Sequence, residues 1–178
     1  LSDLFLVMGT QNPIEQEGTY PLPEAQLDRF LLHVEVGYPS LEDEQKILTL
    51  NRDEAKSSDK NTFTPSKLLT KESIYHARQE ILALHQSNEL EEYIVNLVVA
   101  TRDPGKVDQS LAEQILYGAS PRACMGIDRA ARACAWLKGK DFVGPEDIQE
   151  VAPDILRHRL VLSFEAEADG ITSNQIIA

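Results

Sequence analysis

The sequence places an asparagine where it could orient a water molecule for attack. Residues 4–9 form a continuous apolar run, and Asn12 and Pro13 follow it within a few positions. Such a run, ended by polar residues and a proline, predicts a buried strand of a parallel sheet, and ligands gather at the carboxyl ends of such strands. There an uncharged amide can hydrogen-bond to water without competing for its proton. Taken alone, Asn12 is explained better as a cap of the turn before Pro13.

Arg29, in the sequence Leu27-Asp28-Arg29-Phe30, is a candidate for contact with phosphate. The planar fork of a guanidinium matches phosphate oxygens, and an arginine supplied by a neighbouring subunit can stabilise the charge of a phosphoryl group in transfer. The alternative is a surface ion pair with a carboxylate within reach, for example that of Glu24, which would contribute little to stability. The spacing alone favours the ion pair.

Arg122 is expected at the second position of a helix that Ser120 and Pro121 begin. A cation there opposes the positive end of the helix dipole, at a cost of about 0.3–1 kcal/mol. An anion held at the same helix end would give both the dipole and the guanidinium a partner. The residues leave an anion-binding role and a merely unfavourable position equally open.

Other residue types that often carry chemistry lack a suitable arrangement. The four histidines show no metal-ligand spacing with the two cysteines, so no metal site is predicted: they are His33, His76, His85 and His158, with Cys124 and Cys134. On one helix the cysteines would be about 15 Å apart, too far for a disulfide, which favours reduced thiols and a cytoplasmic protein. No Gly-x-x-x-x-Gly-Lys-Ser/Thr loop and no acidic metal-holding run are present, so the sequence shows no cradle for nucleotide phosphates or Mg²⁺.

Three short elements and a loop are expected before residue 40. The strand at 4–9 is followed by a loop over 14–23, a short helix over 24–32 that Pro23 begins, and a second strand over 33–37. Since a domain seldom starts at its own core, we expect that further sequence precedes this segment. The final residues resemble the middle of a helix, so the C-terminus is expected to be cut as well.

Helices are expected after residue 40. Ser40 with Asp43 predicts a helix to about residue 51, followed by a loop over 53–61. Further helices are predicted wherever a capping residue or a proline precedes a stretch with apolar residues at helical spacing. They begin at Thr64-Pro65, after Ser87, at Ser120 and at Gly144-Pro145. The helical region after Thr64 contains a break whose position the sequence does not show, and the helix from Ser120 is expected to end at Gly139. A weak strand or hairpin is expected over 160–168, and one more helix at the end. The layout is a piece of an α/β core joined near residue 40 to a helical bundle.

The net charge of −12 works against nucleic acid as a partner, because duplex binding depends on lysine and arginine. A helix–link–helix arrangement within 120–158 would permit a DNA-binding helix-turn-helix, but the acidic balance disfavours it. No apolar run approaches the ~18–20 residues that a membrane span requires. We therefore expect neither nucleic-acid binding nor a membrane span.

Four segments resemble the MoxR family of AAA+ ATPases. The longest is the unbroken stretch Gly9–Phe30, and the others are Gly37–Ser40, Gly118–Ala123 and Asp154–Leu160. The resemblance implies that Asn12 is the sensor 1 residue that poises the hydrolytic water. It implies that Arg29 is an arginine finger that reaches the next subunit's nucleotide, and that Arg122 is the sensor 2 residue at the ATP phosphates.

The resemblance also implies a mainly α fold: a helical AAA+ lid bundle over residues 40–178, preceded by a C-terminal remnant of the P-loop core over 1–39. In the family, ATP with Mg²⁺ drives chaperone-like maturation of protein complexes by a ring, commonly hexameric, often with a partner that carries a von Willebrand factor A domain. The phosphate-binding loop and the acidic metal motif of the family are missing here. The chain alone is therefore predicted not to turn over ATP. The alternative is a helical protein-interaction domain that works without nucleotide.

Overall fold

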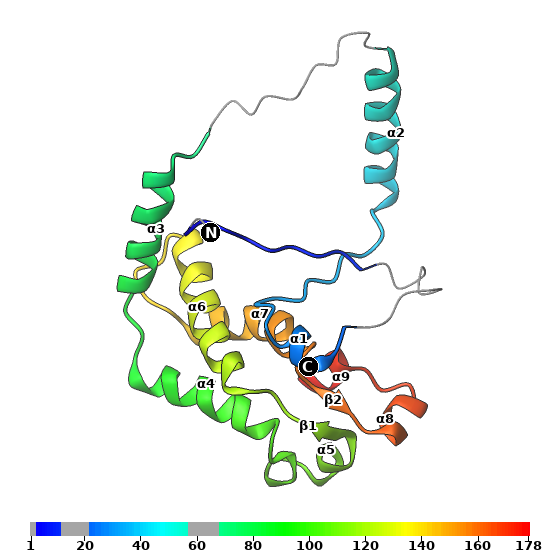
Figure 1. The fold of residues 1–178 in the computed structure, drawn as a ribbon, viewed down its shortest axis with the longest axis vertical. Helices are drawn as coiled ribbons and strands as arrows, with labels where there is room; N and C mark the ends of the chain where they lie inside the picture. The colour runs from blue at the N-terminus through cyan, green and yellow to red at the C-terminus, as the bar shows by residue number, and fades with distance from the viewer. Residues whose placement is uncertain (1–2, 12–21, 57–67) are drawn as a thin grey trace.

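The computed structural model describes residues 3–11, 22–56 and 68–178, and in these ranges the protein is mostly helical (Figure 1). The helices are α1 (Glu24–Leu27), α2 (Leu41–Lys56), α3 (Lys71–Ala83), α4 (Asn88–Ala100), α5 (Gln109–Gln114), α6 (Pro121–Leu137), α7 (Pro145–Leu156), α8 (Phe164–Ala168) and α9 (Ser173–Ile177), with a 3-10 turn at Pro104–Lys106. The mainly helical fold class is as the sequence predicted.

Local capping signals begin the longer helices where the sequence places them. The hydroxyls of Ser87 and Ser120 accept hydrogen bonds from the backbone N–H groups of Leu90 and Arg122, and the Ser40 hydroxyl accepts one from Asp43. These bonds satisfy N–H groups that have no partner within the helix. The predicted starts of α2, α4 and α6 are therefore confirmed, and α7 begins at Pro145, directly after Gly144, as predicted. Gly139, with φ at 70°, follows the end of α6 as predicted.

Helix α6 lies at the centre of the bundle, packed mainly against α7 and also against α4 and α3 (Figure 1). Alanines at four-residue spacing give one face of α6 small side chains, so neighbouring helices can approach this face closely. The fully buried core residues come chiefly from α4, α6 and α7: Val98, Ala123, Ile127, Ala131, Ala135, Ile148 and Ile155. This core holds the first turn of α6 in a fixed position.

A buried carboxylate joins the end of α6 to the start of α7. Asp147 is fully buried and accepts hydrogen bonds from the backbone N–H of Gly144 at 3.0 Å and from the Lys140 ammonium at 2.8 Å. The Lys138 ammonium donates a further bond at 3.1 Å. Because the charge of Asp147 is paired and hydrogen-bonded, its burial is tolerated and the connection between the two helices is fixed.

The two strands predicted before residue 40 are wrong for this structure. Residues 5–11 and 32–40 have no regular secondary structure, and Leu6 and Met8 are each 83% exposed. A parallel strand needs neighbouring strands as hydrogen-bonding partners. Among the described residues, the only sheet is the antiparallel pair β1 (Ile115–Tyr117) and β2 (Val161–Leu162), which lies elsewhere in the fold.

Other element boundaries also differ from the prediction. Of the weak strand or hairpin expected over 160–168, the strand is present as β2, but helix α8, which Ser163 caps, follows it in place of a second strand. Helix α2 extends to Lys56, beyond the predicted end near 51, and the start expected at Thr64-Pro65 lies outside the described residues. Helix α3 begins after Thr70, whose hydroxyl accepts from Ser73 N–H. None of the residues of α2 is buried, and α2 stands apart from the bundle in Figure 1.

Helix α1 ends at Leu27 instead of continuing to residue 32. The backbone carbonyls of several following residues accept hydrogen bonds from another part of the chain instead of from a next helical turn. The carbonyls of Asp28, Phe30 and Leu31 accept hydrogen bonds from the guanidinium of Arg159, which follows α7. The backbone N–H of His33 donates to the carbonyl of Asp154 at 2.8 Å. The segment after α1 is thereby docked on the C-terminal end of α7.

Candidate functional site at the first turn of α6

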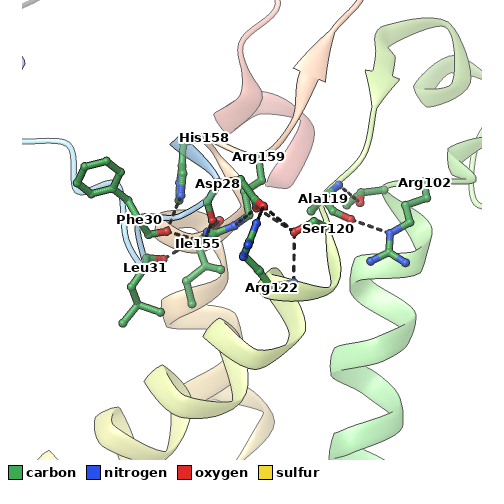
Figure 2. Close-up of polar contacts among 11 residues, drawn as sticks. Asp28, Phe30, Leu31, Arg102, Ala119, Ser120, Arg122, Ile155, His158 and Arg159 are labelled. Carbon is green, nitrogen blue, oxygen red and sulfur yellow. Dashed lines mark hydrogen bonds and ion pairs between the residues drawn. The ribbon is translucent and has the colours of Figure 1, made fainter. Parts of the chain in front are cut away.

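The carboxylate of Asp28 connects three parts of the chain. It accepts hydrogen bonds from the Ser120 hydroxyl at 2.9 and 3.0 Å, from Arg122 Nη1 at 2.8 Å and from Arg159 Nε at 3.0 Å. Figure 2 shows these side chains converging on Asp28 from the start of α6 and from the segment after α7. The Asp28 side chain is 18% exposed, so this carboxylate lies close to the surface and remains reachable from it.

Arg159 is the buried member of this group. Its side chain is 3% exposed, and besides Asp28 its guanidinium donates to four backbone carbonyls, those of Asp28, Phe30, Leu31 and Ile155. A planar guanidinium with several donors suits such a cage of carbonyl oxygens, whereas an ammonium would not reach all of them. Arg159 therefore fixes the backbone that carries Asp28.

Arg122 is the exposed member. Its side chain is 54% exposed and forms an ion pair with Asp28 at the N-terminal turn of α6. The sequence indicated that a cation at this position lacks a partner unless an anion lies at the helix end. An internal carboxylate supplies this anion, and it pairs with both the guanidinium and the Ser120 cap.

Asp28 is ionised at neutral pH. Burial opposes ionisation and would raise its pKa, but the hydrogen bonds from Arg122, Ser120 and Arg159, together with the charge of Arg159, outweigh burial and hold the pKa of Asp28 below its usual range. The site therefore contains one carboxylate and two guanidinium groups, with a net charge of about one positive unit from these three side chains. This net positive charge is compatible with binding of an additional anion at the site.

His158 lies beside this site but does not change charge near neutral pH. Burial first, and then the positive charge of Arg159, lower the pKa of His158 to about 4. Its ring meets that of His33 edge to face, with the ring centres 5.9 Å apart, and its Nε2 lies 3.2 Å from the Phe30 carbonyl oxygen. Its Nδ1 is buried and has no hydrogen-bonding partner within the described ranges. Because the imidazole is neutral at pH 7, it contributes no charge for binding an anion.

A small open cavity of about 190 Å³ adjoins Asp28 and Arg159, between α1, β1 and β2. Ligand pockets for small molecules usually enclose roughly 300–1,000 Å³. The cavity is therefore too small to hold a whole nucleotide. A ligand at the first turn of α6 would contact this chain through a part of its surface, such as a phosphate group.

A close backbone approach positions the loop before α6. A Cβ atom on Gly118 would lie 2.2 Å from the Thr101 carbonyl oxygen, nearer than real Cβ contacts allow. The same loop is fixed by the backbone N–H of Ala119, which donates to the Thr101 hydroxyl at 2.9 Å, and by Arg102 Nε, which donates to the Ala119 carbonyl at 2.7 Å. These contacts hold Ser120 at the start of α6.

Gly118→Ala is expected to destabilise the protein by about 1–3 kcal/mol or more, because the added methyl group forces the loop away from Thr101. Urea denaturation followed by circular dichroism would measure the loss. Gly37→Ala is the matched control, since nothing lies within 4 Å of a Cβ at Gly37, and its midpoint should match that of the wild type. Equal midpoints for both variants would show that the close approach at Gly118 is unimportant.

Of the three candidate site residues predicted from the sequence, one belongs to the group around Asp28 in the structure. Arg122 is part of the group around Asp28, whereas Asn12 lies outside the described residues. The side chain of Arg29 is exposed and forms no hydrogen bond or ion pair among the described residues, so the alternative of a surface ion pair, for example with Glu24, is not found there. Arg29 is the direct neighbour of Asp28 in the chain.

Asp28 and Arg159 were not among the site residues predicted from the sequence. Each is part of a short run of charged or polar residues with apolar residues on both sides, Leu27–Phe30 and Ile155–Leu160, and this is the signal that could have drawn attention to them. Cys124 and Cys134 are free and half-buried on α6. Within the described ranges, no three acidic, histidine or cysteine side chains are grouped to hold a metal ion, and no helix is long and apolar enough to cross a membrane.

Two family models match the chain at the segments that form this site. Residues 108–178, which include Ser120, Arg122 and Arg159, match the AAA lid domain. Residues 1–32, which include Asp28 and Arg29, match the ATPase family associated with various cellular activities. The helical bundle and the site at its edge therefore define a protein of the AAA+ class.

Similarity to individual proteins shows which family of the AAA+ class the chain belongs to. The chain is 45% identical over 177 residues to the chaperone MoxR1 of Mycobacterium tuberculosis, covering 97% of this chain and 44% of MoxR1. It is 41% identical to the protein YeaC of Bacillus subtilis, covering 99% and 51%. The solved structure of a proposed ATPase from Cytophaga hutchinsonii matches with a TM-score of 0.89 at 44% identity, covering 99% and 52%. The chain, which spans about half the length of these relatives, belongs to the MoxR family.

Proposed function

We propose that this chain forms the C-terminal part of a longer AAA+ ATPase of the MoxR type, in which ATP binding and hydrolysis drive chaperone-like remodelling of protein complexes. The observation that carries the proposal is the half-exposed guanidinium of Arg122, held at the N-terminal turn of α6 beside a single carboxylate. A helix N-terminus with an adjacent arginine is suited to a phosphate group. Residues 1–39 would belong to the nucleotide-binding core and residues 40–178 to the lid.

Three residues have distinct roles in this proposal. Arg122 binds the ATP phosphates from the lid, as sensor 2, and Asn12 orients the hydrolytic water, as sensor 1. Arg29 acts in trans as an arginine finger, and its exposed, unpaired side chain among the described residues suits contact with a neighbouring subunit. The groups that cradle the remaining phosphates and hold Mg²⁺ would lie elsewhere in the longer protein, so the 178-residue chain alone would not hydrolyse ATP.

The proposed assembly is a homo-oligomeric ring, a hexamer, since a finger that acts in trans requires a neighbouring subunit at every nucleotide site. The proposed partners are protein clients and a protein with a von Willebrand factor A domain, and the proposed compartment is the cytoplasm. The acidic net charge of −12 supports protein rather than nucleic-acid clients.

Arg122→Ala in the longer protein is expected to weaken MgATP binding by about tenfold or more, because a hydrogen bond to a charged group contributes about 1.5–3 kcal/mol. Equilibrium binding of a fluorescent ATP analogue would measure the affinity, with phosphate release by the 178-residue chain as the baseline for turnover. Arg129→Ala, at another exposed arginine of α6, is the matched control and should leave the affinity unchanged.

Unchanged affinity and turnover in Arg122→Ala would contradict the proposed role of Arg122. That outcome would instead favour the alternative, a helical protein-interaction domain that works without nucleotide. One observation favours this alternative: α2 exposes apolar side chains that could contact another protein, among them Leu41, Ile47, Leu48 and Leu50.

A further inference from the structure

Asp28 binds its two arginines very unequally. Arg159 is 3% exposed and is held by four backbone carbonyls in addition to the carboxylate. The side chain of Arg122 is 54% exposed, and Asp28 is the only hydrogen-bonding partner of its guanidinium among the described residues. Exposed ion pairs are weak and easily exchanged, whereas a buried guanidinium in a cage of carbonyls is not. Arg122 is therefore the exchangeable partner.

The loss of Arg122 would leave Asp28 well satisfied. The carboxylate would keep the hydroxyl of Ser120 at 2.9 Å and the guanidinium of Arg159 at 3.0 Å. Because one charged and one neutral donor remain, the negative charge of Asp28 would not be left uncompensated. The guanidinium of Arg122 can thus move to another anion without disturbing the rest of the group.

From this geometry we propose that Asp28 is a positioning residue that holds Arg122 in the nucleotide-free state, and that the phosphates of ATP take Arg122 away from it by competition. This inference rests on the function proposed above and adds a regulated step to it. Asp28 lowers the affinity for nucleotide because the ion pair must be broken, and it also keeps the guanidinium at the first turn of α6, where phosphate can reach it. Arg159 stays bound to Asp28 in both states.

The test is a double-mutant cycle in the longer protein, with a nonhydrolysable ATP analogue as the probe. Asp28→Asn keeps the size and an acceptor oxygen but removes the charge, so it should tighten binding of the analogue about two- to fivefold, the range set by the strength of exposed ion pairs. In the Arg122→Ala background the same substitution should change the affinity by less than about 1.5-fold, since the competing pair is already absent.

Two outcomes of this cycle would overturn the inference. Tighter binding of equal size in both backgrounds would show that Asp28 merely repels the phosphates. Unchanged or weaker binding in a folded Asp28→Asn protein would show that the ion pair does not compete with nucleotide. Thermal melting of each variant would establish that it is folded, because Arg159 loses its counter-charge in Asp28→Asn.

A second measurement needs no substitution. A structure of the wild-type longer protein with the analogue bound should show Arg122 more than 4 Å from Asp28 and at the phosphates, with the Arg159–Asp28 bond retained. Arg122 still paired with Asp28 in that structure would overturn the inference. Failure of the wild-type protein to bind the analogue at all would instead contradict the proposed function, so the two failures are distinguishable.

Discussion

Arg29→Ala is expected to lower ATP turnover by the longer protein by about 10³-fold or more, because an arginine finger stabilises the charge of the transferring phosphoryl group. The affinity for ATP should stay within about twofold of the wild type, since the finger acts mainly on the transition state of a neighbour's reaction. The exposed position of Arg29, without a hydrogen bond or ion pair among the described residues, is the structural basis for this expectation.

Steady-state phosphate release and equilibrium nucleotide binding, measured on the same preparation, would separate the two effects of Arg29→Ala. Arg52→Ala is the matched control, since Arg52 is an exposed arginine on α2 that has no part in the proposed site. Size-exclusion chromatography would show whether the oligomer persists. If binding and turnover fell equally with the oligomer intact, Arg29 would not be a finger that acts on the transition state.

Arg159→Ala is the substitution expected to cost the most stability, about 3–5 kcal/mol of the free energy of unfolding, a magnitude typical of breaking a buried ion pair. The change removes the fixed counter-charge of Asp28 and takes the guanidinium donor away from four backbone carbonyls, of which only that of Phe30 keeps another polar contact among the described residues, with His158 Nε2. The Ser120 and Arg122 contacts to Asp28 remain, but neither reaches the carbonyls of Phe30 and Leu31.

Urea denaturation of the 178-residue chain would measure the effect of Arg159→Ala as a shift of the midpoint. Arg129→Ala, an exposed arginine on α6, serves as the control and should change stability by less than about 0.5 kcal/mol. Arg159→Lys should recover only part of the loss, because an ammonium lacks the planar fork. A loss below about 1 kcal/mol in Arg159→Ala would mean that solvent replaces the guanidinium without cost.

The helices could be predicted from the sequence because their signals are local. The capping residues Ser40, Ser87 and Ser120 each bond to a backbone N–H group two or three residues further along the chain, so a short window of sequence contains the whole interaction. The prediction of a strand at 4–9 was wrong because a strand depends on contacts with distant parts of the chain. Its apolar run indicates burial, but a strand exists only beside other strands, and the described residues offer none there.

The site could be predicted only in part. The position of Arg122 at a helix start indicated that the guanidinium needs an anion, and this follows from a few adjacent residues. That the anion is Asp28, 94 residues earlier, has no local signature, nor has the pairing of Asp28 with Arg159 across 131 residues. Long-range polar pairs of this kind depend on the packing of α6 and α7, which local patterns do not specify.

The docking of residues 28–35 on α7 has a consequence for how the protein opens. No residue in this segment is buried, and most of its contacts are polar: those of Asp28 with Ser120, Arg122 and Arg159, those of His33 with Asp154 and Arg157, and those of Glu35 with Arg157 and Asn174. The Leu31 side chain also lies close to Gly126 of α6. Undocking therefore exposes little apolar surface, and the core between α4, α6 and α7 can stay intact. Local unfolding of this segment needs less free energy than global unfolding, so Arg29 can change position while the bundle remains folded.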